Sequence, residues 1–282
     1  MIRRASSDKW VLARRLRALA RHEHRRQYAI SWWRRCRCSM EMPFGGRALM
    51  GLSRLVFPEI MDRLPATDAA SLRIRRDLNL INCLIPNSRI IARSLASRFP
   101  NGAPRVLLDI GCGSGKVMLQ VARRLAPRWK NVTVLLLDQQ GLIDQEMRDA
   151  FAALEWKVEP VVADVFDFLQ QRNGPELDGI VTNLFLHHFP DDQLSRLLAL
   201  IARSAPLFVA CEPRRAKLAL RVGQNLWVIG CDDITCHDVA ASIWAGFKGQ
   251  ELSARWPTPA EWRIDESTVW PFTHCFVASR AA

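Results

Sequence analysis

The chain has 282 residues, of which 49% are hydrophobic and 24% charged, and its formal net charge is +12. This composition is typical of a globular protein, and the apolar stretches are too short and interrupted to cross a bilayer, which excludes a membrane-spanning segment. The length permits one large domain or two small ones, and we expect one domain with appendages.

The basic charge is concentrated at the N-terminus. Residues 1–40 contain twelve Lys and Arg and two acidic residues, a net charge of +10, which leaves +2 for residues 41–282. Four apolar residues fall at helical spacing among the arginines: Val11, Leu12, Leu16 and Leu19. A basic amphipathic helix contacts anionic lipid, nucleic acid or a protein partner, but a transit peptide or a solvated extension also fits. We expect a basic extension over residues 1–45 that touches at most a membrane surface, and no nucleic-acid partner.

Eight cysteines are scattered along the chain, without a repeated pair at zinc-binding spacing and without a secretory signal. Cys36 lies near Cys38, and Cys231 and Cys236 lie near His237, but neither spacing matches known metal sites. We therefore expect reduced thiols, no disulfide, no metal ion and a cytoplasmic protein.

Two helices are predicted ahead of the first strand, because apolar residues recur at helical spacing over 72–85 and over 90–95, on either side of Pro86. Strands and helices alternate after the loop signal at residues 101–104. The expected strands are 105–110, 132–138, 157–164, 177–183 and 206–212. The expected helices are 116–126, 142–154, a short one near Phe166, 191–205 and 214–227.

Alternating strands and helices indicate right-handed crossovers and a mostly parallel sheet with both faces covered. Residues 261–280 instead offer two neighbouring strands with no helix between them, which predicts a terminal hairpin with an antiparallel strand. The expected fold class is α/β, a doubly wound, mostly parallel seven-stranded sheet with a C-terminal antiparallel hairpin. Residues 46–103 are expected to form a helical N-terminal cap on a Rossmann-like core over residues 104–282.

The segment LLDIGCGSGKV, residues 107–117, joins the first expected strand to the helix that follows. In a doubly wound sheet the ligand crevice lies at the carboxyl ends of the strands, which places this loop at its centre. Its three alternating glycines permit a tight turn and let a ligand approach main-chain N–H groups. A Walker-type phosphate loop needs Ser or Thr where Val117 stands, and a dinucleotide fingerprint needs Gly where Lys116 stands.

The pattern that remains is Asp-x-Gly-x-Gly-x-Gly, formed by Asp109, Gly111, Gly113 and Gly115. With this motif and the acids that end later strands, the chain from about residue 50 to the C-terminus resembles the class I S-adenosylmethionine-dependent methyltransferases. The resemblance implies S-adenosylmethionine as the cofactor, and it implies that Cys112 belongs to the loop that holds it.

The resemblance also implies cofactor contacts at the ends of the second, third and fourth strands: Asp138 with Gln139, Asp164 with Val165, and Asn183 with Leu184. Asp138 matches the position where a carboxylate accepts hydrogen bonds from both ribose hydroxyls. Asp164 matches the position beside the adenine amine, and the last pair the backbone beside the methionine part. Capping of the next helix is the alternative role for each acid, although three acids at successive strand ends make capping alone the weaker explanation.

Four further segments narrow the resemblance: FPEIMD, RRDLNLIN, NLFLHHF and HDVAASIWAGFKGQELSARWP. They look similar to a bacterial subgroup of small-molecule methyltransferases of polyketide or quinone-type biosynthesis. TNLF stands where some relatives carry an Asn-Pro-Pro-Tyr-like motif, which disfavours amino-group methylation by that arrangement. The implied acceptor is a hydroxyl of an aromatic or polyketide-like metabolite. The alternatives are an RNA methyltransferase with a basic docking arm and a non-catalytic cofactor-binding protein.

Three histidines are candidates for the base that removes the acceptor's proton: His187, His188 and His237. The first two follow the fourth strand, and imidazole titrates near neutral pH. Two adjacent histidines do not easily point into one pocket, so we expect one of them to pack or to cap the next helix. His237 has Asp238 beside it, and a carboxylate can orient an imidazole and raise its basicity. Catalysis by proximity alone is the alternative to all three.

Substrate recognition is expected from the helices before the sheet and from residues 226–260. Four aromatic residues there are candidates for an aromatic-accepting pocket, with core packing as the alternative: Trp227, Trp244, Phe247 and Trp256. Arg214 and Arg215 follow the fifth strand, and they are expected either to hold an acidic substrate or to form a solvated helix start.

Overall fold

The computed structural model describes residues 53–61, 64 and 68–281. All of them belong to one unit of the chain, 52–282. The basic extension expected over residues 1–45 lies outside the described residues. None of the helices in the described part combines the length and apolar character that crossing a bilayer requires.

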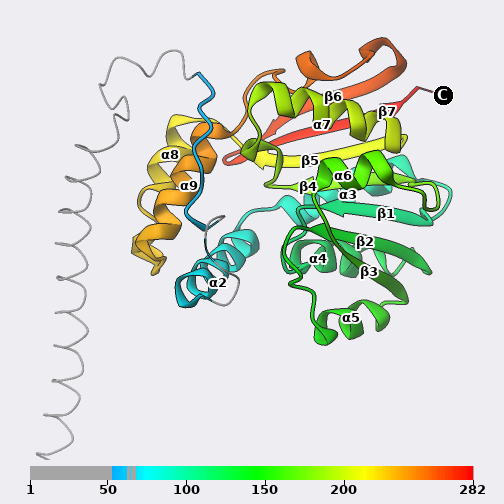
Figure 1. The fold of residues 1–282 in the computed structure, drawn as a ribbon, viewed down its shortest axis with the longest axis horizontal. Coiled ribbons are helices and arrows are strands. Elements are labelled where there is room, and N and C mark those ends of the chain that lie inside the picture. The colour runs from blue at the N-terminus through cyan, green and yellow to red at the C-terminus, as the bar shows by residue number, and fades with distance from the viewer. Residues whose placement is uncertain (1–52, 62–63, 65–67, 282) are drawn as a thin grey trace, which may run out of the picture. The chain divides into compact units, whose positions relative to one another are not determined.

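The described residues form a seven-stranded sheet in the order β3-β2-β1-β4-β5-β7-β6 (Figure 1). The strands are β1 (Val106–Ile110), β2 (Val132–Asp138), β3 (Trp156–Val162), β4 (Gly179–Asn183), β5 (Leu207–Pro213), β6 (Trp262–Val269) and β7 (Thr273–Arg280). The first five pair in parallel, whereas β7 runs antiparallel to both β5 and β6. The expected sheet and its terminal hairpin are confirmed. Because the winding reverses between β1 and β4, the ligand crevice of this fold lies at their carboxyl ends.

Helices cover both faces of the sheet. They are α2 (Ala69–Leu84), α3 (Asn87–Arg98), α4 (Lys116–Leu125), α5 (Gln145–Ala152), α6 (Val165–Gln171), α7 (Asp191–Ser204), α8 (Lys217–Gly223) and α9 (Asp233–Ala245). Successive strand residues point to opposite faces. Leu107 and Val134 thus pack in one buried cluster with α3, α4 and α5, while Leu108 and Leu135 pack in another with α6 and α7.

Two helices begin later than their patterns suggest, for local reasons. Helix α5 begins at Gln145 because the Asp144 carboxylate accepts the N–H of Met147 at 2.8 Å, an N-terminal cap. Helix α8 begins only at Lys217 because Arg214 still follows the sheet edge, where its N–H donates to the carbonyl of Phe272 at 2.7 Å. Helix α8 is followed by a short 3-10 helix, η4 (Leu226–Ile229).

The cap over the sheet is built from two distant parts of the chain. Helices α2, α8 and α9 gather at one end of the sheet (Figure 1), and α9 contacts both of the others. Helix α3 was expected in the cap, but Ile91 and Leu95 pack it onto the sheet. Residues 54–59 form no helix or strand. They contact α9, where the N–H of Leu55 donates to the carbonyl of Trp244 at 3.2 Å.

Candidate functional site

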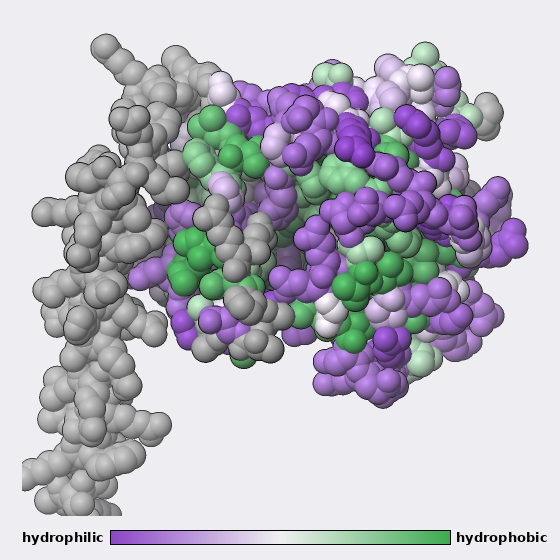
Figure 2. All heavy atoms as spheres, in the orientation of Figure 1, coloured by the Kyte–Doolittle hydropathy of each residue, from purple (hydrophilic) through white to green (hydrophobic). Residues whose placement is uncertain are grey.

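A cavity of about 1010 Å³ is lined by the carboxyl ends of β1, β2 and β4 and by the cap helices α2, α8 and α9. Small-molecule sites commonly measure roughly 300–1,000 Å³, so this cavity has room for a large ligand or for two. It lies where the doubly wound topology places a ligand. The surface over α8 and α9, at one side of the cavity, is markedly hydrophobic (Figure 2).

Most residues expected to bind the cofactor line this cavity. They are Asp109, Gly111, Cys112, Gly113, Asp138, Gln139, Val165, Asn183 and Leu184. Gly115 and Asp164 are not among the lining residues. The first lies at the start of α4 and the second at the start of α6. The structure therefore brings nine of the eleven expected residues into one wall.

The glycine loop holds three left-handed residues, with φ angles of 70° at Gly111, 53° at Gly113 and 74° at Gly115. A β-carbon at Gly111 would lie 2.3 Å from the ring of Phe185, whereas one at Gly113 would meet no atom within 4 Å. The N–H groups of Gly111 and Cys112 donate to the carbonyl of Leu137 at 2.9 and 3.1 Å. These two groups are engaged within the protein, so the glycines there provide close approach rather than free donors.

Asp138 closes the loop from the end of β2. Its two carboxylate oxygens accept the N–H groups of Gly113 and Gln140, both at 2.8 Å. The cap of the following helix, α5, is Asp144, so helix capping does not explain Asp138. An ionised carboxylate has about four acceptor sites, and two of them remain for adjacent hydroxyl donors such as those of a ribose. The site thus fits the sugar of an adenosyl cofactor.

Asp164 does cap a helix. Its Oδ1 accepts the N–H groups of Phe166 and Asp167 at 2.8 and 3.3 Å, and the side chain of Gln139 donates to its Oδ2 at 3.1 Å. The capping alternative therefore holds for this acid. Its contact with an adenine stays a prediction.

The end of β4 carries backbone strain beside the loop. Leu184 has a φ of 54°, in the left-handed region that costs a non-glycine residue roughly 1–3 kcal/mol. Its N–H donates to the carbonyl of Cys211 at 2.8 Å, which holds it in place. Asn183 accepts a hydrogen bond from the side chain of Asn87 at 2.7 Å. The strained turn places Phe185 over Gly111 and narrows the cavity there.

Asp109 is buried beside the loop. Burial, and then the negative charge of Asp138, raise its pKa to about 8. A positively charged ligand group in this part of the cavity would favour the ionised form. Such a group is expected of a sulfonium cofactor.

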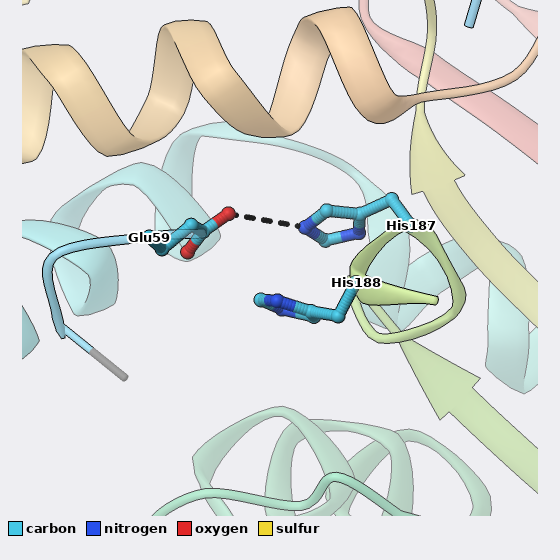
Figure 3. A group of neighbouring side chains, drawn as sticks. All are labelled: Glu59, His187 and His188. Atoms are coloured by element: carbon cyan, nitrogen blue, oxygen red, sulfur yellow. Dashed lines mark hydrogen bonds and ion pairs between the residues drawn. The ribbon is translucent and has the colours of Figure 1, made fainter. Parts of the chain in front are cut away.

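His187 and His188 both line the cavity. They belong to a 3-10 turn, η3 (Leu186–His188), and their ring centroids are 4.3 Å apart (Figure 3). The tight turn lets both rings border the cavity, but His187 is buried, so one of the two packs inside the protein as expected. His237 is not among the lining residues; its Nδ1 lies 2.9 Å from Asp238, which also accepts the N–H groups of Ile60 and Met61.

Two glutamates that the sequence did not single out as site residues hold the histidine turn. The Oε1 of Glu212 accepts the N–H groups of Phe185 and Leu186 at 3.0 and 2.9 Å, and its Oε2 lies 2.8 Å from Nδ1 of His187. Glu59 lies 3.4 Å from Nε2 of the same ring and accepts a hydrogen bond from Ser242. An acid that ends the buried strand β5 was the available signal for Glu212. No local pattern marks Glu59.

The two glutamates change the titration of His187. Burial lowers its pKa, but the hydrogen bonds and charges of Glu212 and Glu59 outweigh that effect and raise the pKa to about 9. For Glu59, burial acts to raise the pKa. The hydrogen bond and charge of His187 outweigh that effect, so the pKa of Glu59 lies below its ordinary value. His187 therefore carries a positive charge near neutral pH and forms a buried ion pair with Glu59.

Glu59, His187 and His188 are also the group of described residues whose ligand atoms come close enough to suggest a metal ion, all within 4.8 Å of one another. The ligands of a tetrahedral zinc ion lie about 3.3 Å apart, since each bond measures roughly 2.0–2.1 Å. The wider spread and the ion pair of His187 explain this cluster without an ion, and we assign none. The six described cysteines are free thiols.

Residues 226–260 contribute an aliphatic wall, not an aromatic one. None of the four aromatic candidates is among the lining residues, and Trp244, Phe247 and Trp256 are buried in the core. For these three residues the alternative of core packing holds, and the exposed Trp227 does not line the cavity either. Arg215 is buried as well, donating to the carbonyl of Gly246 and pairing with Glu251, so it is neither a substrate contact nor a solvated helix start.

Comparison with known proteins agrees with this site. The family described as "Methyltransferase domain" matches residues 107–205. The ornithine lipid N-methyltransferase of Singulisphaera acidiphila is 29% identical over 114 residues, which make up 40% of this chain and 58% of that protein. The match thus spans little more than half of that relative.

Solved structures share the fold. The plantazolicin methyltransferase BpumL, in complex with a triazolic desmethylPZN analog and SAH, has a TM-score of 0.56 and 14% identity over 76% of this chain and 93% of its own. An O-methyltransferase family protein from Burkholderia thailandensis has a TM-score of 0.55 and 15% identity over 85% of this chain and 68% of its own. Residues 107–205 match a methyltransferase domain, and the glycine loop and the strand order agree with the fold of the class I S-adenosylmethionine-dependent methyltransferases that the sequence resembles.

Proposed function

We propose that the chain transfers a methyl group to a hydroxyl of a small, largely apolar metabolite, aromatic or polyketide-like. The observation that carries the proposal is the aliphatic wall opposite the glycine loop. Its members are Leu78, Ile81, Leu84, Ile85, Leu226, Val228, Ile229, Val239 and Ile243. Apolar side chains of this kind accept a ring or a hydrocarbon chain and exclude water from the reacting atoms.

The cofactor half of the cavity has the groups that hold an adenosyl sulfonium. When bound, S-adenosylmethionine would supply an electrophilic methyl carbon: the acceptor oxygen would bond to it in line as the carbon–sulfur bond breaks, with adenosylhomocysteine as the leaving group. Asp138 would accept hydrogen bonds from the ribose, and Asp109 would offer a carboxylate to the positive sulfonium. The glycine loop brings the main chain close to both. The protein contributes chiefly position, which alone lowers the barrier of a two-reactant step substantially.

His188 is the histidine best placed to receive the acceptor's proton. Both ring nitrogens of His187 lie against carboxylates: Nδ1 is 2.8 Å from Glu212, and Nε2 is 3.4 Å from Glu59 (Figure 3). The ring of His188 lies beside it in the cavity wall. Glu212, Glu59 and His187 thereby position the turn, and His188 acts as the general base. A positioned base contributes roughly 10²–10⁴-fold to the rate.

A lipid amine is the second candidate acceptor, because the relative from Singulisphaera acidiphila is named an ornithine lipid N-methyltransferase and the aliphatic wall also suits an acyl chain. RNA is disfavoured as the acceptor. Single-stranded RNA is held by aromatic stacking, and the cap side of the described cavity presents mainly aliphatic side chains.

The acceptor is identified by incubating the full chain with methyl-labelled S-adenosylmethionine and a fractionated extract of the source organism. We expect the label in a small molecule that partitions into organic solvent, with the mass gain of one CH₂ per transfer. Label in RNA or protein would contradict the proposal, and a chain that binds cofactor but labels no fraction would favour the non-catalytic alternative.

A further inference from the structure

The exposed apolar side chains of this protein are concentrated on the cap. Ten large hydrophobic residues of the described chain are exposed, and eight of them belong to α2, α8 and η4: Leu72, Leu80, Leu84, Leu218, Val222, Trp227, Val228 and Ile229. We name these eight residues the cap patch. The other two, Val162 and Trp270, lie elsewhere on the sheet. Exposed apolar patches of this extent on one set of elements mark interaction surfaces.

The cap patch surrounds an entrance to the cavity. Four of its members also line the cavity: Leu84, Val222, Val228 and Ile229. They come from all three elements, so α2, α8 and η4 meet at this rim. Figure 2 shows the hydrophobic surface over the α8 side. The apolar surface of the patch is therefore continuous with the apolar lining of the cavity.

Basic residues predominate among the charges beside the cap patch, although Arg73 pairs with Asp232 at 3.4 Å. The exposed charged residues of α2 and α8 are all basic: Arg73, Arg76, Lys217 and Arg221. The acid of α2, Asp77, is buried against Arg76, and Asp232 and Asp233 at the start of α9 are half-buried. On α2 the exposed residues 72, 76, 80 and 84 recur every fourth position, so the apolar and basic groups share one face.

We propose that the cap patch docks on an anionic lipid surface and that the acceptor is an apolar molecule drawn from it, an inference whose second half rests on the proposed function. Leucine, valine and isoleucine side chains enter the acyl boundary, a tryptophan such as Trp227 sits at the headgroup level, and the basic residues face anionic headgroups. A cover formed by residues 1–40 is disfavoured, because their net charge of +10 has the same sign as the rim.

The experiment measures co-sedimentation of the full-length chain with phosphatidylglycerol-containing and with pure phosphatidylcholine vesicles. Two matched pairs of variants separate the cap from other exposed apolar sites. Val228 and Val162 are 67% and 63% exposed, and Trp227 and Trp270 are 42% and 72% exposed. Val228→Glu and Trp227→Ser are expected to lower partition to anionic vesicles about tenfold or more. Val162→Glu and Trp270→Ser are expected to leave it unchanged.

Added salt distinguishes binding through the cap patch from binding through the basic N-terminal residues. Salt screens the attraction of those basic residues to anionic lipid, whereas insertion of the apolar cap patch persists. The proposal is overturned if the Val228 and Val162 variants partition alike, which is also the outcome if another part of the chain or a protein partner covers the patch. Calorimetric titration with adenosylhomocysteine accompanies each variant. A variant that loses vesicle binding but still releases the normal heat with adenosylhomocysteine has a folded cofactor site. If the unaltered chain releases no heat with adenosylhomocysteine, that result counts against the proposed function and not against docking.

Discussion

Two buried carboxylates of the site, those of Glu212 and Asp109, have different neighbours. Glu212 accepts two main-chain N–H groups and contacts an imidazole, so its negative charge is compensated. Asp109 has the negative Asp138 as its charged neighbour, and its pKa rises to about 8. The glycine motif identifies Asp109 from the sequence, and the family resemblance identifies Asp138 at the end of the second strand. Neither identifies Glu59 or Glu212, because their partners lie 128 and 25 residues away from them along the chain.

Gly111→Ala is expected to destabilise the protein by about 2–5 kcal/mol. The left-handed backbone costs a residue with a β-carbon roughly 1–2 kcal/mol, and the overlap with the ring of Phe185 adds about 1–3 kcal/mol. Chemical denaturation measures the loss. Gly102→Ala is the matched control, since a β-carbon there meets nothing within 4 Å, and it should change the free energy of unfolding by less than about 0.5 kcal/mol. Equal losses in the two variants would refute the close approach.

Asp109 gives the cofactor-free protein a pH dependence of known sign. Its folded pKa of about 8 lies above the ordinary value of 3.8, so the folded state binds the proton more tightly. The associated stability is complete below about pH 4 and is lost as the pH rises through about 8, by at most roughly 1.4 kcal/mol per unit. Urea unfolding of the wild type and of Asp109→Asn across this range measures the difference. The raised pKa would be contradicted if the free energy of unfolding of the wild type, relative to that of the variant, does not fall as the pH rises.

His188→Ala is expected to lower kcat by about 100-fold or more while leaving the affinity for adenosylhomocysteine unchanged. The reason is that the proposed role of His188 is to take the acceptor's proton, whereas the proposed ribose contact belongs to Asp138. Steady-state kinetics on the identified acceptor and calorimetry provide the two readings. A kcat that stays within about twofold of the wild type would leave proximity alone as the source of catalysis.

At the level of elements, the irregular segment 53–61 is fastened to the cap and to the histidine turn. Arg54 donates to the carbonyls of His187, Phe189 and Ala245, at 3.2, 2.8 and 2.8 Å. The buried carboxylate of α9, Asp238, accepts the N–H groups of Ile60 and Met61 at 2.9 and 3.0 Å. These contacts carry Glu59 to the cavity. They also give Asp238 a role other than orienting a catalytic His237.

Asp238→Ala is expected to release this segment. Each hydrogen bond to a charged group contributes about 1.5–3 kcal/mol, so losing both should lower the exchange protection of the Ile60 and Met61 amides on the order of 100-fold. Hydrogen exchange followed by mass spectrometry measures it, with the exposed Asp192→Ala as the control. Unchanged exchange in residues 55–61 would show that Arg54 and Glu59 hold the segment without Asp238.

For the whole molecule, the sequence predicts the sheet far better than the cap. Strand and helix periodicity is local, and the confirmed antiparallel hairpin follows from two strands with no helix between them. The cap unites α2 with α9, whose residues are more than 140 positions apart, so no local pattern shows it. The same limit explains why the sequence left the pocket and the core open as alternatives for Trp256, whose ring stacks on Phe208 in the core at 5.7 Å between centroids.

The central claim is that the cavity binds an adenosyl cofactor whose ribose is held by Asp138, and calorimetric titration with adenosylhomocysteine tests it most directly. We expect one molecule bound per chain, and Asp138→Ala should lose affinity about 10- to 100-fold as hydrogen bonds to a charged group disappear. Asp144→Ala, which removes an acid that only caps α5, should reduce stability but leave the affinity unchanged. No heat in the wild type, or equal affinity in Asp138→Ala and the wild type, would contradict the claim.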